Sequence, residues 1–155
     1  MRGRLEMLVL GLALALALDG FLVAAEIDSV DKYAWSENSG WLNFNSHYGT
    51  TQVFEDHLEG YAWAENIGWI RLGSHTGGGA YHYSNTSVGD WGVNQAVTGK
   101  LSGYAWSENA GWINFGAANT QLTLSTDTGA LEGYAWGENI GWIHFNQSVP
   151  AYKVR

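Results

Sequence analysis

Residues 33–44 read Tyr-Ala-Trp-Ser-Glu-Asn-Ser-Gly-Trp-Leu-Asn-Phe, and close copies of this phrase return at residues 61–72, 104–115 and 134–145. Tyr, Ala, Trp, Glu, Asn, Gly and a second Trp stand at the same places in every copy. Internal repetition is typical of architectures in which each unit buries its apolar face against its neighbours. The four phrases therefore predict four similar structural units.

Each phrase predicts a β-hairpin. Its two ends are short, aromatic and rich in β-branched residues, which favours strands. The insert between them has the form x-Glu-Asn-x-Gly, in which Asn tolerates left-handed backbone and Gly supplies a positive φ at the loop exit. A loop of this kind suits a hairpin built around a type I turn. The four inserts contain Asn38, Asn66, Asn109 and Asn139.

The tryptophans of the phrases are expected to hold the hairpins together. Strand alternation places Trp63 opposite Trp69 on one face of the second hairpin and its aliphatic side chains on the other. A facing aromatic pair contributes about 0.5–1.5 kcal/mol beyond its buried area. Their regular placement favours burial in the core over an exposed platform for sugar rings. The pairs are Trp35 with Trp41, Trp63 with Trp69, Trp106 with Trp112, and Trp136 with Trp142.

The repeated unit is longer than the phrase. In the second, third and fourth copies a Leu stands three residues before the Tyr and a Gly stands one residue before it. Segments of matching type lie farther upstream, at residues 48–52, 91–95 and 121–125, and the last alternates like a strand. Each unit is therefore predicted to be a three-stranded antiparallel meander, with an outer strand before the two strands of the hairpin.

The two ends of the repeat array are complementary. Residues 26–32 are too few to supply a full outer strand before the first phrase, whereas residues 151–155 match an outer strand in type. The C-terminal strand either closes the first unit of its own chain or completes the first unit of the next molecule in a head-to-tail polymer. Closure within the chain is favoured because effective concentration promotes it.

The expected fold class is all-β, with four antiparallel β-meanders that close like a propeller or a barrel. A β-solenoid, which would stack the repeated Trp and Asn side chains in ladders, is the alternative. The longest spacing between phrases contains residues 73–90. We interpret this segment as an exposed excursion that carries the function particular to this protein. A disordered Gly-rich loop is the alternative. Residues 26–155 are expected to form one domain.

Residues 1–25 are typical of a secretory signal peptide. Arg2 and Arg4 make a basic start, residues 7–18 are apolar but too few to span a bilayer, and Ala25 ends a run of small residues. An uncleaved membrane anchor is the alternative. We expect a secreted protein in an extracellular or cell-surface setting, or in the periplasm, with no membrane span after cleavage.

The composition of the chain limits the classes of partner that it can bind. The formal net charge of −8 disfavours nucleic acid and anionic lipid, both of which need a basic surface. The chain has no Cys, which excludes disulfides and thiolate metal sites. The partners that remain are the protein itself, another envelope component or a glycan.

The pattern Gly-Tyr-Ala-Trp-x-Glu-Asn-x-Gly-Trp-Ile-x-Phe resembles repeats of uncharacterised secreted or cell-surface bacterial proteins. The match covers all four phrases and most of the chain after residue 25. The resemblance implies export and a surface or extracellular setting. It implies no activity, cofactor or catalytic residue.

The repeated glutamates offer the only recurrent charged group. One Glu and one Asn per loop supply too few of the 6–8 oxygens that Ca²⁺ prefers. We therefore predict no metal site and no cofactor. If an ion does bind, these residues are the weak candidates for Ca²⁺ ligands. Glycoside hydrolysis by paired carboxylates is a remote alternative, because repetition makes the four glutamates equivalent whereas catalysis needs unlike environments. We therefore predict no catalytic residue. The four are Glu37, Glu65, Glu108 and Glu138.

Aromatic residues outside the phrases are the better candidates for ligand binding. Tyr81, Tyr83 and Trp91 are predicted to form an exposed binding face, because exposed aromatics concentrate at interfaces. His75 and His82 flank a Gly run and could contact a metal, although solvated loop positions are favoured. We expect a non-catalytic secreted protein with a structural or interaction role at the cell surface, self-assembly by strand addition included. A carbohydrate-binding module is the alternative.

Overall fold

The computed structural model describes residues 24–155, and all regular secondary structure in this part of the chain is β-strand. The predicted leader, residues 1–25, falls outside the described residues except for Ala24 and Ala25. Among residues 24–155, no helix is long and apolar enough to cross a membrane.

Each of the four phrases forms a β-hairpin, as predicted. The hairpins are β2 (Tyr33–Ser36) with β3 (Gly40–Asn43), β6 (Leu58–Ala64) with β7 (Gly68–Arg71), β9 (Leu101–Ser107) with β10 (Gly111–Asn114), and β13 (Tyr134–Gly137) with β14 (Gly141–His144). The outer members of each insert pair across the hairpin, as Ser36 does with Gly40, so only the residues between them form the loop. The loop-exit Gly has the expected positive φ, +72° at Gly40.

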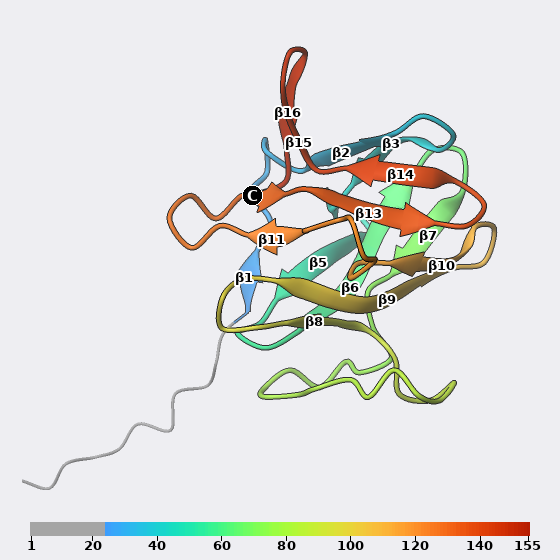
Figure 1. The fold of residues 1–155 in the computed structure, drawn as a ribbon, viewed down its shortest axis with the longest axis vertical. Coiled ribbons are helices and arrows are strands. Elements are labelled where there is room, and N and C mark those ends of the chain that lie inside the picture. The colour runs from blue at the N-terminus through green and yellow to red at the C-terminus, as the bar shows by residue number, and fades with distance from the viewer. Residues whose placement is uncertain (1–23) are drawn as a thin grey trace, which may run out of the picture.

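The four hairpins close into an eight-stranded antiparallel barrel (Figure 1). β3 pairs with β6, β7 with β9, β10 with β13, and β14 returns to pair with β2. Because the last hairpin pairs with the first, every strand of the ring has a partner on both sides. The all-β class and the barrel-like closure are thereby confirmed. The solenoid and propeller alternatives are wrong, because the hairpins pair edge to edge in one continuous sheet.

Small and large side chains alternate inside the barrel. In the middle of the first hairpin, Ala34 pairs with Leu42, and both are fully buried. The equivalent buried pairs are Ala62 with Ile70, Ala105 with Ile113, and Ala135 with Ile143. Toward one end, the Phe145 ring packs against Phe44 and Phe115 at centroid distances of 5.4 and 5.8 Å. Pairing one small with one large residue suits the limited space inside a narrow barrel.

The phrase tryptophans lie on the outer face of the barrel, which corrects the expectation that they are buried in the core. The two indoles of each hairpin do face each other, with ring centroids 4.8 Å apart for Trp35 and Trp41. The second Trp of each pair keeps 37–46% of its surface exposed. The reason is space: the inward positions are filled by Ala, aliphatic and Phe side chains, and the indoles occupy the opposite face of the same strands.

The repeated asparagines connect neighbouring hairpins. Asn109 Nδ2 donates a hydrogen bond to the carbonyl oxygen of Ile67, in the turn of the preceding hairpin, over 2.9 Å. Asn66 takes the equivalent place, with its Nδ2 3.4 Å from the position that a Cβ on Gly40 would occupy. Three of the four turns are thus hydrogen-bonded to the turn before them in the ring. The other such bonds run from Asn139 to Ala110 (3.0 Å) and from Asn38 to Ile140 (3.1 Å).

Outer strands precede three of the hairpins, in agreement with the predicted meanders. They are β5 (Gly49–Val53), which pairs with β6, β8 (Val93–Gln95), which pairs with β9, and β11 (Thr123–Leu124), which pairs with β12 (Leu131–Glu132) just before β13. The short strands β1 (Ala25–Glu26) and β4 (Asn45–Ser46) both pair with β5. Gly103 marks the bend where β9 enters the barrel. It has φ +86°, and a Cβ there would lie 2.1 Å from the Gly92 carbonyl oxygen, so a larger residue would not fit.

The C-terminal segment returns to the start of its own chain. The hairpin of β15 (Asn146–Ser148) and β16 (Ala151–Lys153) projects at the top of Figure 1, and the chain then runs back to the first unit. Val154 forms a bridge with Lys32, and the Asp28 N–H donates to the Arg155 carbonyl over 2.7 Å. The Arg155 guanidinium lies 3.2 Å from Asp31. The predicted closure within the chain is thereby confirmed at Val154 and Arg155, whereas residues 151–153 pair with β15.

Candidate functional site

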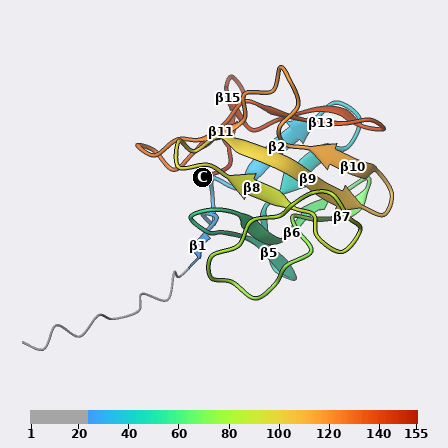
Figure 2. The same cartoon turned by 60° about the horizontal axis from the view of Figure 1, so that its bottom comes forward.

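The excursion at residues 73–90 packs against β6 and β8 (Figure 2). It contains no strand of its own, but Gly73 bridges Gly92 and Ser87 bridges Asp90. The expected exposure holds for much of the loop, residues 86–89 and His82 included, whereas Tyr83 is buried and Tyr81 is half-buried. The loop is therefore attached to the barrel through buried residues such as Tyr83, while much of its outer surface is exposed.

Tyr83 is completely buried, which corrects its assignment to an exposed binding face. Its hydroxyl donates to the Leu58 carbonyl over 3.0 Å, and its backbone N–H donates to Asn94 Oδ1 over 2.9 Å. Its ring fills the space beside Gly73 and Gly92. A Cβ atom at Gly73 would lie 2.1 Å from the Tyr83 hydroxyl oxygen, and one at Gly92 would lie 2.4 Å from a carbon of the ring. Burial raises the pKa of the Tyr83 hydroxyl. Tyr83 therefore anchors the loop and cannot contact a ligand.

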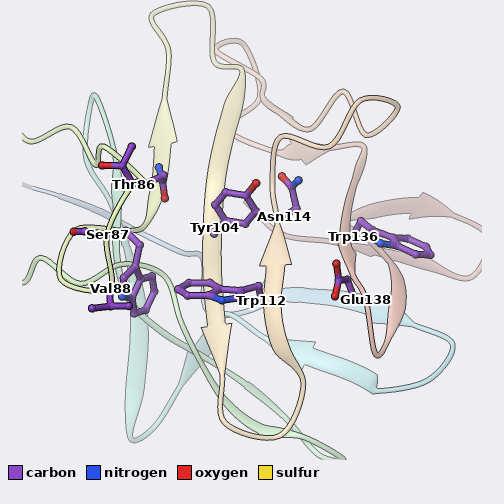
Figure 3. Close-up of a pocket in the computed structure, with 10 residues that line it drawn as sticks. Thr86, Ser87, Val88, Tyr104, Trp112, Asn114, Trp136 and Glu138 are labelled. Atoms are coloured by element: carbon purple, nitrogen blue, oxygen red, sulfur yellow. The ribbon is translucent and has the colours of Figure 1, made fainter.

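A groove of about 590 Å³ lies between this loop and the third hairpin (Figure 3). Tyr104 and Asn114 are cross-strand neighbours on β9 and β10, and Trp136 is the next neighbour of Asn114 on β13. Figure 3 shows the loop residues Thr86, Ser87 and Val88 on one side of Trp112, with Glu138 and Trp136 on the other. The lining residues are Asn85, Thr86, Ser87, Val88, Trp91, Tyr104, Trp112, Asn114, Trp136 and Glu138.

Trp112 lies at the centre of the groove and is held by other aromatic rings. Its centroid lies 5.2 Å from Trp91, 4.8 Å from Trp106 and 6.1 Å from Tyr104, each in an edge-to-face arrangement. Even so, 42% of its surface stays exposed. The guanidinium of Arg71 in turn lies 5.7 Å from the Trp91 ring. A rigid, exposed indole can bind a ligand without losing much side-chain entropy.

Tyr81 lies away from the groove, against His75, with ring centroids 3.9 Å apart and planes nearly parallel. Its hydroxyl donates to Asp90 Oδ1 over 3.1 Å, and this bond raises the pKa of Tyr81. Hydrogen bonds from Ser84 lower the pKa of Asp90. Of the three aromatics predicted to bind a ligand, only Trp91 therefore lines the groove.

The polar lining of the groove consists of hydroxyl, amide and carboxylate groups. Among the lining residues, all of them in the described part of the chain, none is Lys or Arg, and Glu138 is the single carboxylate. Asn114 Oδ1 accepts a hydrogen bond from the Gly116 N–H over 2.8 Å, which directs its amide NH₂ elsewhere. Such a lining can exchange hydrogen bonds with hydroxyl groups but provides no cation for a phosphate.

The other repeated glutamates gather into no site. All four are exposed, and within residues 24–155 they join no group of three close metal-ligating side chains. Only Glu138 lines the groove. A second, smaller hollow of about 360 Å³ lies over the second hairpin, lined by Tyr48, Tyr61 and Trp69. In the first hairpin, Tyr152 packs on Trp41 at 5.1 Å, so the units present different outer surfaces.

Sequence reasoning missed Tyr104 and Asn114 and treated Trp112 and Trp136 as structural only. One signal was present: the longest insertion of the chain directly precedes the third unit, so the outer face of that unit was the one to examine. No family model, curated protein or solved structure matches this chain. The resemblance of the repeats to those of secreted bacterial proteins therefore stays a prediction.

Proposed function

We propose that this chain is a non-catalytic, secreted interaction protein that binds carbohydrate in the groove over its third hairpin. The observation that carries the proposal is the exposed Trp112 indole with Tyr104, Trp91 and Trp136 around it and neutral polar groups at the margins. Aromatic rings stack on the apolar faces of sugars, while amide and hydroxyl groups bond to the sugar hydroxyls.

The size and charge of the groove agree with an oligosaccharide ligand. Its volume of about 590 Å³ falls within the usual range of small-molecule sites, roughly 300–1,000 Å³. The net charge of −8 and the lack of lining cations favour a neutral ligand over an anionic one. The leader-like residues 1–25 support the extracellular or cell-surface setting in which glycans are met.

The carboxylates around the groove support binding of a glycan without its hydrolysis. Glycosidases place two carboxyl groups about 5–10 Å apart around the scissile bond. Glu138 is the one carboxylate in the lining, and it serves here as a hydrogen-bond acceptor for a hydroxyl. Self-assembly by strand addition has less support, since the C-terminal strand would have to leave Lys32 and Asp28 of its own chain.

The test is binding of the purified protein to an array of neutral glycans, followed by calorimetry with the strongest ligand. Trp112→Ala is expected to weaken binding at least about 10-fold, because a central aromatic carries more than 1 kcal/mol in most interfaces. Trp41→Ala is the matched control, since Trp41 has the same place in its phrase, is 37% exposed and packs on residues outside the groove. No retained glycan, or equal losses in both variants, would refute the proposal, and release of reducing ends would refute its non-catalytic form.

A further inference from the structure

We propose that His57, Glu59 and His75 form a binding site for a divalent transition-metal ion, best suited to Zn²⁺, where the excursion meets β6. One ligand atom from each of the three side chains lies within 4.8 Å of the other two. His57 Nε2 is 2.9 Å from Glu59 Oε1, and His75 Nε2 is 3.7 Å from the same oxygen. The sequence pattern predicts no metal site here, because His57 and Glu59 lie far from His75 along the chain.

The local sequence explains how the ligands come together. His57 and Glu59 flank Leu58, which faces the core, so strand alternation directs both polar side chains to the same side. The excursion then brings His75 over them, with the Gly78 N–H donating to Glu59 Oε1 over 2.9 Å. The other three units have Ser29, Lys100 and Ala130 at the place of His57, so the second unit alone carries this set.

Burial of the glutamate is the physical argument for a cation. The side chain of Glu59 is 3% exposed and that of His57 is fully buried, whereas His75 keeps 27%. A buried carboxylate is costly unless a positive charge or several hydrogen bonds compensate it. Within residues 24–155, the basic groups close enough to pair with Glu59 are these two imidazoles. A divalent ion between the three side chains compensates the carboxylate directly.

Neighbouring groups orient the His57 ring as metal sites require, whereas His75 Nε2, which lies 3.2 Å from the Gly78 carbonyl oxygen, exchanges that contact for the ion. Asp56 Oδ1 lies 2.6 Å from His57 Nδ1 and leaves Nε2 directed at Glu59. A carboxylate on the far nitrogen of a ligating His is the usual outer-shell partner in zinc sites. Asp56 Oδ2 also accepts the Tyr81 N–H over 2.9 Å, and the Tyr81 ring stacks on His75 at 3.9 Å. The two rings are therefore held in place from outside the site.

The types of ligand atom and the distances between them indicate which metal ion the site binds. Two imidazole nitrogens and one carboxylate oxygen suit Zn²⁺ rather than Ca²⁺, which takes oxygen ligands. Zinc bonds of about 2.0–2.2 Å in tetrahedral geometry put ligand atoms roughly 3.3–3.6 Å apart. The two separations from Glu59, 2.9 and 3.7 Å, need adjustments of only a few tenths of an ångström, and the two imidazole nitrogens, within 4.8 Å of each other, move together by up to about 1.5 Å. The ion takes the place of the proton between His57 and Glu59, and water completes the coordination.

Binding is tested by calorimetric titration of the metal-free protein with Zn²⁺ and by absorption spectroscopy with Co²⁺ as a probe. We expect one ion per chain, a tetrahedral Co²⁺ spectrum, and a rise in Tm on the order of 5 °C with Zn²⁺ in excess. His75→Ala is expected to weaken Zn²⁺ binding at least about 10-fold. His82→Ala is the matched control, because His82 is exposed on the same loop and belongs to no such group.

Absence of Zn²⁺ binding by the wild-type chain, or unchanged affinity in His75→Ala, would overturn the proposal. Variants of the buried His57 are avoided because they could fail to fold for other reasons. Glu59→Gln provides a second test of the site. The amide oxygen can still accept the hydrogen bond from the Gly78 N–H, while the negative charge is gone. Unchanged Zn²⁺ affinity in folded Glu59→Gln would also contradict the site. Glycan binding is measured separately with Trp112→Ala, so either proposal can fail without the other.

Discussion

Asn109 shows what a single repeated side chain does in this protein. The motif suggested a turn former, and the structure adds a hydrogen bond from its Nδ2 to the Ile67 carbonyl of the preceding hairpin. Three such bonds occur around the ring, and Asn66 is placed in the equivalent way. The Asn of the phrase therefore connects units as well as shaping loops. Its neighbour Glu108 is exposed and has no corresponding role in the fold.

Asn109→Ala is expected to lower the free energy of unfolding by about 1 kcal/mol, since it removes one partly buried hydrogen bond and leaves a carbonyl without its donor. The adjacent substitution Glu108→Ala should change it by less than about 0.5 kcal/mol, as exposed positions usually do. Urea unfolding followed by circular dichroism measures both. Equal effects of the two substitutions would contradict the connecting role of the asparagine.

At the scale of elements, the segment before β2 and the segment after β16 depend on each other. The Asp28 carboxylate accepts the backbone N–H groups of Asp31 and Val30, over 2.9 and 2.7 Å. These two bonds, with a smaller contribution from the charge of Arg155, lower the pKa of Asp28 below its usual 3.8. The ionised form is thus favoured in the folded protein. Its stabilisation is fully present above the unfolded-state value and is lost as pH falls through the lower folded-state value.

Asp28→Ala is therefore expected to lower Tm at pH 7, and the difference from wild type should narrow as the pH falls below the usual pKa of 3.8 and through the lower pKa of the folded protein. Asp127→Ala, in the exposed turn after β11, is the control and should leave Tm nearly unchanged at both pH values. Differential scanning calorimetry at several pH values gives the comparison. A difference in Tm that is constant with pH would show that the charge of Asp28 does not matter.

At the scale of the whole molecule, closure of the ring makes the units interdependent. Phe145 of the fourth hairpin packs on Phe44 of the first at 5.4 Å and on Phe115 of the third at 5.8 Å. Open repeat arrays can unfold unit by unit, because each repeat contacts only its neighbours. In a closed barrel no unit is terminal, so loss of one hairpin exposes the interior of all the others.

Phe145→Ala is expected to destabilise the protein by about 3–5 kcal/mol, as large-to-small substitutions of buried aromatics do. The remaining protein should still unfold in one transition, with circular dichroism and tryptophan fluorescence changing together. Val149→Ala, at a position 80% exposed, is the control. Two separate transitions in Phe145→Ala would show that the hairpins fold independently.

The sequence by itself determined the hairpins, their register and their turns, because residue type and spacing act locally. Facing tryptophans, the positive φ of Gly40 and the outer strands all follow from such local rules. The return of the C-terminus to the first unit, made by residues 154–155, was also predictable, since only one end of the array had a spare strand. Of the groove, Trp91 alone was assigned to ligand binding in advance.

Only the tertiary structure decided which face of each hairpin points inward. Both faces are apolar, so periodicity cannot choose between them, and the narrow barrel admits Ala, Ile and Phe while it leaves the indoles outside. Tertiary contacts also buried Tyr83 between Gly73 and Gly92 and brought His75 to Glu59. These contacts join residues far apart in the chain, and their free energy depends on how neighbouring surfaces fit, which no local pattern records.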